Sequence, residues 1–222
     1  MVPIISVVGA SGVGKTTFLE RLIPELKGRG YRVAVVKHDV HGFEVDVPGK
    51  DSWRLAQAGS DVVVIAGSSK LARIERLEQE RTLGEIAALL PDADIILTEG
   101  YSHGTAPKIE VFRRAVSPEL LCTEEERIAL VTDQPVPLDV PQFGLDEVAG
   151  VVDLLEERFL KGHPRGMVSV LVDGRLISIE RPFAADIIDR TVRGMVSALH
   201  GVGYGRRIVI ILDGPREDGV NH

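Results

Sequence analysis

The sequence of 222 residues contains one cysteine, Cys122, and only 5% aromatic residues. A single cysteine cannot form an intrachain disulfide, and we expect Cys122 to be a buried or half-buried structural side chain rather than a nucleophile. No apolar run approaches the ~20 residues that a membrane-spanning helix needs, and the short N-terminal apolar stretch does not resemble a secretory signal peptide. We therefore expect a cytoplasmic protein that has no membrane partner.

Basic residues are fewer than acidic residues. The chain has 26 lysines and arginines against 33 aspartates and glutamates, which gives a formal net charge of -7. A protein that binds nucleic acid normally presents a broad basic surface, so we expect no nucleic-acid partner. The remaining composition is ordinary for a globular protein, and the length fits one domain with a small appendage.

What the sequence does contain is a glycine-rich stretch, GASGVGKT, at residues 9–16. An apolar run at residues 4–8 leads into it and a helix-compatible segment over residues 16–26 follows it, so the order is strand, loop, helix. Pattern and context together predict a loop that binds the phosphates of a nucleoside triphosphate. Glycines let successive backbone N–H groups turn inward around an anion, and the helix N-terminus adds unpaired donors.

The chemistry of such a loop assigns roles to single residues. Lys15 is expected to reach the terminal phosphates, and the Thr16 hydroxyl to bind Mg²⁺. Asp133 follows a late apolar strand, and its carboxylate would accept two hydrogen bonds from guanine, which favours GTP over ATP. The residues expected around the nucleotide are Gly9, Ser11, Gly12, Val13, Gly14, Lys15, Thr16, Thr17 and Asp133.

Acidic residues at the ends of two further strands are candidates for the metal site. If the strand that ends in Glu99 lies beside the strand that feeds the loop, Glu99 would hold Mg²⁺ through a water or orient an attacking water. Asp94 opens the same strand and is expected at the opposite edge of the sheet. Asp39, after the second strand, would sense the terminal phosphate or the metal. We therefore assign Thr16, Glu99 and Asp39 to the metal, and Lys15, Glu99 and Asp39 to catalysis.

Imidazole and lysine side chains surround Asp39. His38 and His41 could bind a metal when neutral or hold an anion such as phosphate or molybdate when protonated, and both alternatives stay open. Three lysines are expected at the same edge, which suits an anionic ligand: Lys37, Lys50 and Lys108.

Strand and helix patterns alternate over residues 1–162. Strands are predicted at residues 4–8, 31–36, 61–66, 94–99, 109–112 and 128–133, with a half-exposed edge strand at 71–77. Four helices are predicted, of which the first covers residues 16–26 and the last covers residues 145–160. The second begins with Asp51 or Ser52 as its cap and ends at residue 58. The third begins with a capping box formed by Thr82 and Glu85 and ends at residue 90. This order indicates an α/β fold of the P-loop NTPase type, with a mostly parallel sheet and helices on both faces.

The pattern changes after a linker at residues 161–166. Two strands around an Asp-Gly turn, a helix and a last strand predict a small ββαβ module over residues 166–214, followed by a tail at 215–222. The strands are expected at 168–172, 176–179 and 207–212, and the helix at 184–199.

Three blocks, taken in order, resemble a known family. They are the loop at residues 9–17, the segment that runs from KHDVHGF at residue 37 to PGKDS ending at residue 52, and TEG at 98–100 followed by PKIEV at 107–111. On these blocks, residues 2–160 are similar to the molybdopterin-guanine dinucleotide biosynthesis adaptor proteins, MobB. Where the family carries a further pair of histidines, this sequence has Asp39-Val40-His41 and retains one of them.

The resemblance implies a homodimer that binds GTP with Mg²⁺ and hydrolyses it slowly to GDP and phosphate. It also implies two partners: the guanylyltransferase that makes the dinucleotide form of the molybdenum cofactor, and the molybdenum-insertion protein. The module after residue 166 resembles an extension present in some members, and we expect it to add a dimer contact or a partner-docking surface.

Two other classes of P-loop protein are alternatives. A small-molecule kinase would place closely spaced arginines on a lid, and Arg113-Arg114 is the only comparable pair in the first domain. A metallochaperone-type GTPase would deliver a metal through histidines. Only His38, His41 and His103 fall near the expected edge, without a Cys-x-x-Cys motif or a histidine-rich tract.

Overall fold

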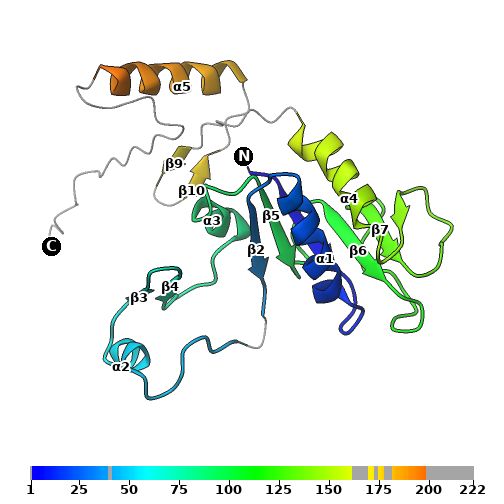
Figure 1. Cartoon of the computed structure of the whole chain (residues 1–222), viewed down its shortest axis with the longest axis horizontal. Helices are drawn as coiled ribbons and strands as arrows, with labels where there is room; N and C mark the ends of the chain where they lie inside the picture. The colour runs from blue at the N-terminus through cyan, green and yellow to red at the C-terminus, as the bar shows by residue number, and fades with distance from the viewer. Residues whose placement is uncertain (1, 40–41, 162–169, 173–174, 178–181, 199–222) are drawn as a thin grey trace, which may run out of the picture. The chain divides into compact units, whose positions relative to one another are not determined.

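Figure 1 shows the computed structural model, which describes residues 2–39, 42–161, 170–172, 175–177 and 182–198. The chain divides into two compact units, residues 2–162 and residues 163–222. His41, the predicted strand at 207–212 and the predicted tail at 215–222 lie outside the described residues.

The first unit is built on a six-stranded parallel sheet. Its strands are β1 (Ile4–Val8), β2 (Val33–Lys37), β5 (Ile95–Glu99), β6 (Lys108–Phe112), β7 (Arg127–Thr132) and β8 (Gln142–Phe143), in the spatial order β2-β5-β1-β6-β7-β8. Every neighbouring pair is parallel, and the predicted α/β fold is confirmed. Because β1 lies between β5 and β6, the glycine-rich loop leaves the middle of the sheet's C-terminal edge. The strand β8 was not predicted, because two residues carry no periodicity.

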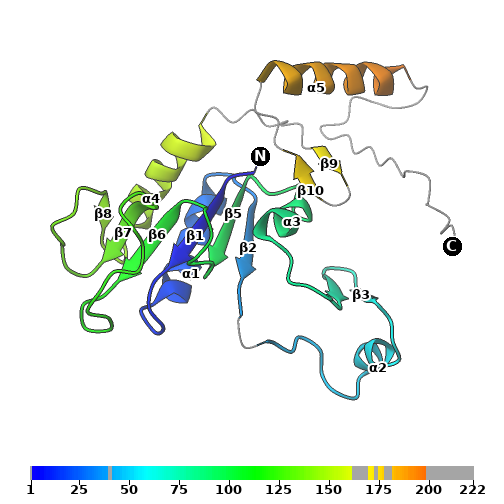
Figure 2. The same cartoon turned by 180° about the vertical axis from the view of Figure 1, so that it is seen from behind.

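Two helices pack against each other on one face of the sheet (Figure 1), and the strands lie in front of them in the reverse view (Figure 2). They are α1 (Lys15–Gly28) and α4 (Val148–Leu155), and α4 continues into a π-helical turn, η1 (Glu156–Leu160). Their apolar sides form the core with alternate residues of the strands; the members include Phe18, Leu22, Leu26, Val151, Leu155, Ile5, Val7, Ile95 and Leu97. The helix predicted over residues 145–160 is therefore shorter and changes type after residue 155.

The opposite face of β6 and β7 buries charged side chains. Glu110 accepts a hydrogen bond from Arg127 Nε at 2.8 Å, and both side chains are almost fully buried. The Lys108 ammonium donates to Glu126 at 2.7 Å and to the Gly104 carbonyl at 2.6 Å. The prediction that Lys108 contributes charge at the ligand edge is wrong. Lys108 is the first residue of β6 and its side chain is buried on this face.

A separate two-stranded sheet interrupts the chain between β2 and β5. It consists of β3 (Val62–Ala66) and β4 (Leu71–Glu75), which pair antiparallel, with Gly67 N donating to Lys70 O at 2.9 Å in the turn. Strands are present at both predicted places, and β4 is a half-exposed edge strand as expected, but the two form a sheet of their own and are not part of the parallel sheet. A connection of this length joins antiparallel neighbours, whereas a parallel neighbour needs a long crossover.

Two short helices flank this hairpin in the sequence. The first, α2 (Asp51–Gln57), begins after Lys50 and has no side-chain cap, so the predicted cap by Asp51 or Ser52 is wrong. The second, α3 (Leu83–Ala88), begins with the predicted capping box, in which Thr82 N donates to Glu85 Oε2 at 2.8 Å and Glu85 N donates to Thr82 Oγ1 at 3.3 Å.

The second unit contains the predicted hairpin and helix. Strands β9 (Val170–Val172) and β10 (Arg175–Ile177) pair antiparallel, and α5 (Pro182–Ser197) follows. No helix among the described residues combines the length and apolar character needed to cross a bilayer.

Candidate nucleotide-binding site

The glycine-rich loop adopts backbone conformations that favour glycine. Gly9 has φ +145°, and a Cβ atom placed on it would lie 2.3 Å from the Val111 carbonyl oxygen of β6. Gly12 has φ +73°, and Gly14, the N-cap residue of α1, has φ +104°. Gly14 has no side chain with which to cap the helix, so the first backbone donors of α1 are available to an anion.

Lys15 folds back over the loop. Its ammonium donates to the carbonyl oxygens of Gly9 and Ala10, both at 2.9 Å. Gly9 and Ala10 are the first two residues of the loop, so the ammonium group is held where β1 ends and the loop begins. The sequence predicted that this ammonium group binds the phosphates.

Thr16 and Glu99 meet beside the loop. The Thr16 hydroxyl oxygen lies 3.0 Å from each carboxylate oxygen of Glu99. The contact exists because β5 pairs with β1, with Glu99 in register with Val7. The expectation that this strand neighbours β1 is therefore confirmed, and Asp94 lies at the opposite end of β5, where it accepts a hydrogen bond from Arg32 N at 2.7 Å.

The Thr16–Glu99 pair fits a magnesium ion by the chemistry of its donors. A hydroxyl and a carboxylate oxygen are hard ligands of the kind that Mg²⁺ takes, and the ion commonly completes its shell with water and substrate phosphates. Within the described part of the chain, no group of three or more histidine, cysteine, aspartate and glutamate side chains is arranged to hold a metal. Thr16 and Glu99 supply two such ligands, and water and phosphate oxygens would supply the others.

His38 forms a layer with Tyr101 next to Glu99. The His38 amide donates to the Glu99 carbonyl at 3.0 Å, and its ring stacks on Tyr101 with centroids 4.6 Å apart. His38 Nε2 lies 2.8 Å from Glu80 Oε1. Burial and the Glu80 charge raise the pKa of Tyr101, which also has a positive φ of 56°. Sequence reasoning missed this layer, because Glu80 and Tyr101 carry no motif.

Asp39 and Asp133 occupy the same edge of the sheet at different distances from the loop. Asp39 follows β2, one strand beyond Glu99, and is exposed. Asp133 follows β7 on the other side of β1 and is exposed. The structure brings Glu99 into contact with Thr16 at the end of the loop. The roles of Asp39 and Asp133 stay predictions.

These features define an α/β protein of the P-loop NTPase type, with a glycine-rich loop, a lysine over it and a threonine–glutamate pair beside it. The family model described as "Molybdopterin guanine dinucleotide synthesis protein B" (MobB) matches residues 4–133. The chain belongs to the MobB family.

Individual relatives agree with this assignment. The chain is 36% identical over 163 residues to the molybdopterin-guanine dinucleotide biosynthesis adapter protein of Escherichia coli (strain K12), covering 71% of this chain and 93% of that protein. It is 34% identical over 157 residues to the protein of the same name in Haemophilus influenzae, covering 70% and 88%. A crystal structure of molybdopterin-guanine biosynthesis protein B matches with a TM-score of 0.53 at 33% identity, covering 69% of this chain and 98% of that one.

Proposed function

We propose that this protein is a GTP-binding adapter with weak Mg²⁺-dependent GTPase activity that serves the formation of molybdopterin guanine dinucleotide. The observation that carries the proposal is the Thr16–Glu99 pair beside the loop, at 3.0 Å, together with the Lys15 ammonium over the loop. The relatives with more than 30% identity are named as adapter proteins in this biosynthesis, which supports the biological role.

Each residue of the site has a stated task in this proposal. The loop amides and the Lys15 ammonium bind the phosphates, and Lys15 exchanges its two carbonyl partners for phosphate oxygens. Thr16 and Glu99 hold Mg²⁺, which when bound neutralises charge on the phosphate oxygens. Glu99 also accepts a hydrogen bond from the attacking water. Asp39 responds to the terminal phosphate, and the Asp133 carboxylate accepts hydrogen bonds from guanine.

We further propose that the protein is a cytoplasmic homodimer whose partners are the guanylyltransferase and the molybdenum-insertion protein. The β3–β4 hairpin supports the dimer. Val62, Val64 and Leu71 share one of its faces and are 37%, 55% and 70% exposed. Apolar side chains on a two-stranded sheet with free edges favour pairing with another chain, here a second copy. Val64→Glu should shift the molar mass measured by light scattering from dimer to monomer.

The nucleotide proposal is tested by calorimetric titration of GTP and ATP with Mg²⁺ into the full chain. We expect preferential binding of GTP, weakened ~10–100-fold by Lys15→Ala, since a charged hydrogen-bond donor is lost. The matched control is Lys27→Ala, an exposed lysine near the other end of α1 that should leave binding unchanged. A preference for ATP with fast transfer to a small acceptor would instead establish a kinase. Zn²⁺ or Ni²⁺ retained in stoichiometric amount through chelation would instead establish a metallochaperone.

A further inference from the structure

Arg113 approaches the glycine-rich loop from a strand that carries none of the assigned metal-site residues. It is the first residue after β6, which pairs with β1 on the side opposite to β5. A Cβ atom placed on Gly14 would lie 3.5 Å from Arg113 Nη2 and 3.7 Å from its Cζ. The guanidinium therefore packs on the loop at the residue that precedes Lys15.

The guanidinium has no anionic partner in the described part of the chain. Its Nε is shielded from solvent and has no hydrogen-bond partner there, and no described carboxylate oxygen comes within 4.0 Å of its nitrogens. Arg29 and Arg127, by contrast, are both paired with carboxylates. A shielded N–H without an acceptor is destabilising, so the position of this guanidinium is not explained by a partner in the described residues. Its Nη2, the nitrogen nearest to Gly14, is the donor that an anion in the loop would meet.

The strand order indicates which anion fits. Glu99 lies on one side of β1, at the metal end of the proposed site, and Asp133 lies after β7 on the other side, at the proposed base end. Arg113 follows the strand between β1 and β7, so it stands on the base side of the loop. A phosphate group that Arg113 contacts there is one that nucleoside diphosphates and nucleoside triphosphates both carry.

We propose that Arg113 binds the phosphates of the nucleotide at the base side of the loop, and that it contributes equally to binding of GDP and GTP. This inference rests on the proposed nucleotide binding. Arg113 acts as a fixed, forked donor, which suits two oxygens of one phosphate group better than a lysine does. It adds a second positive charge to that of Lys15 and does not favour GTP over GDP or GDP over GTP.

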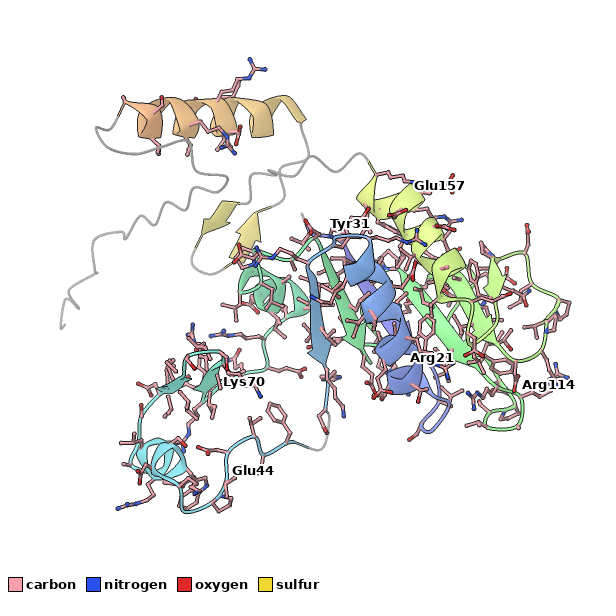
Figure 3. All side chains as sticks on the ribbon, viewed as in Figure 1. Arg21, Tyr31, Glu44, Lys70, Arg114 and Glu157 are labelled. Carbon is pink, nitrogen blue, oxygen red and sulfur yellow. The ribbon has the colours of Figure 1, made fainter. Side chains whose placement is uncertain are left out.

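The test compares Arg113→Ala, Arg113→Lys and Arg114→Ala in the full chain by calorimetric titration of GDP and of GTP with Mg²⁺. Arg114 is the matched control, because it is the next residue, carries the same charge and is exposed on the loop after β6, where Figure 3 labels it. We expect Arg113→Ala to weaken GDP and GTP by the same factor, ~10–100-fold, as for loss of a charged donor. Arg113→Lys should recover part of the affinity, and Arg114→Ala should match the wild type.

The outcomes distinguish a failure of the Arg113 inference from a failure of the proposed nucleotide binding. A wild-type chain that binds neither nucleotide refutes the proposed function itself. A wild-type chain that binds both while Arg113→Ala binds them equally well refutes the role of Arg113. Weakening of GTP alone would place Arg113 at the terminal phosphate and overturn the assignment to the shared phosphates. A melting temperature within 2–3 °C of the wild type, roughly the effect of 1 kcal/mol, shows that the variant is folded.

Discussion

Replacing Gly9 by alanine tests the tightest contact in the loop. The added Cβ would lie 2.3 Å from the Val111 carbonyl oxygen, whereas an ordinary contact of a Cβ atom lies at 3.4–4 Å, so the loop and β6 would have to separate by about 1 Å. The backbone of Gly9 also has φ +145°, a conformation that L residues rarely adopt. Both effects act on a strand pair at the centre of the sheet.

The size of the effect follows from those two terms. Backbone strain of about 1–3 kcal/mol and overpacking of about 1–3 kcal/mol give a loss of ~2–6 kcal/mol. That is a large part of a typical stability of about 5–15 kcal/mol. At about 2–4 °C per kcal/mol for a chain of this size, the melting temperature should fall by ~4–24 °C.

The matched control is Gly12→Ala in the same loop. Gly12 also has a positive φ, +73°, but a Cβ atom placed on it would have no neighbouring atom within 4 Å. Only the left-handed conformation is penalised there, by about 1–2 kcal/mol. Melting followed by circular dichroism should therefore rank wild type above Gly12→Ala and Gly12→Ala above Gly9→Ala. Equal melting temperatures for the two variants would refute the argument from the Val111 contact.

Two further predictions concern the buried face of β6 and β7. Burial and the Glu110 charge raise the pKa of Cys122 to about 12, so little of the reactive thiolate is present at pH 8. We therefore expect iodoacetamide at pH 8 to label the folded chain on the order of 10³-fold more slowly than the urea-unfolded chain. Equal labelling rates would contradict this prediction. The Lys108 ammonium lowers the pKa of Glu126 below 4.5, so this pair stabilises the fold above pH 4.5 and the stabilisation is lost as the pH falls through the lowered pKa. Denaturant midpoints measured from pH 7 to pH 3 should fall less steeply in Glu126→Gln than in the wild type, and parallel curves would rule the pair out.

The local patterns of the sequence were sufficient for the elements that position the loop. Residues 4–8 are apolar except for Ser6, as suits a strand that is covered on both faces, and the positive φ angles of the loop require the glycines that follow. The capping box of Thr82 and Glu85 was predicted for the same reason, since both partners lie within one helical turn. The choice of Glu99 needed one assumption about strand order, which the pairing of β1 with β5 bears out.

Contacts between segments that are distant in the sequence could not be predicted from those patterns. The side chain of Lys108 pairs with Glu126 on a buried face, although its place in the sequence suggested the ligand edge. His38 stacks on Tyr101, and Arg113 packs against Gly14, across separations of 63 and 99 residues that only the sheet order brings together. The sequence by itself therefore determined the loop, its flanking strand and helix, and the residue types of the site. The tertiary structure alone decided which charged groups face the loop, because strand order and register are set by packing over the whole sheet rather than by neighbours in the chain.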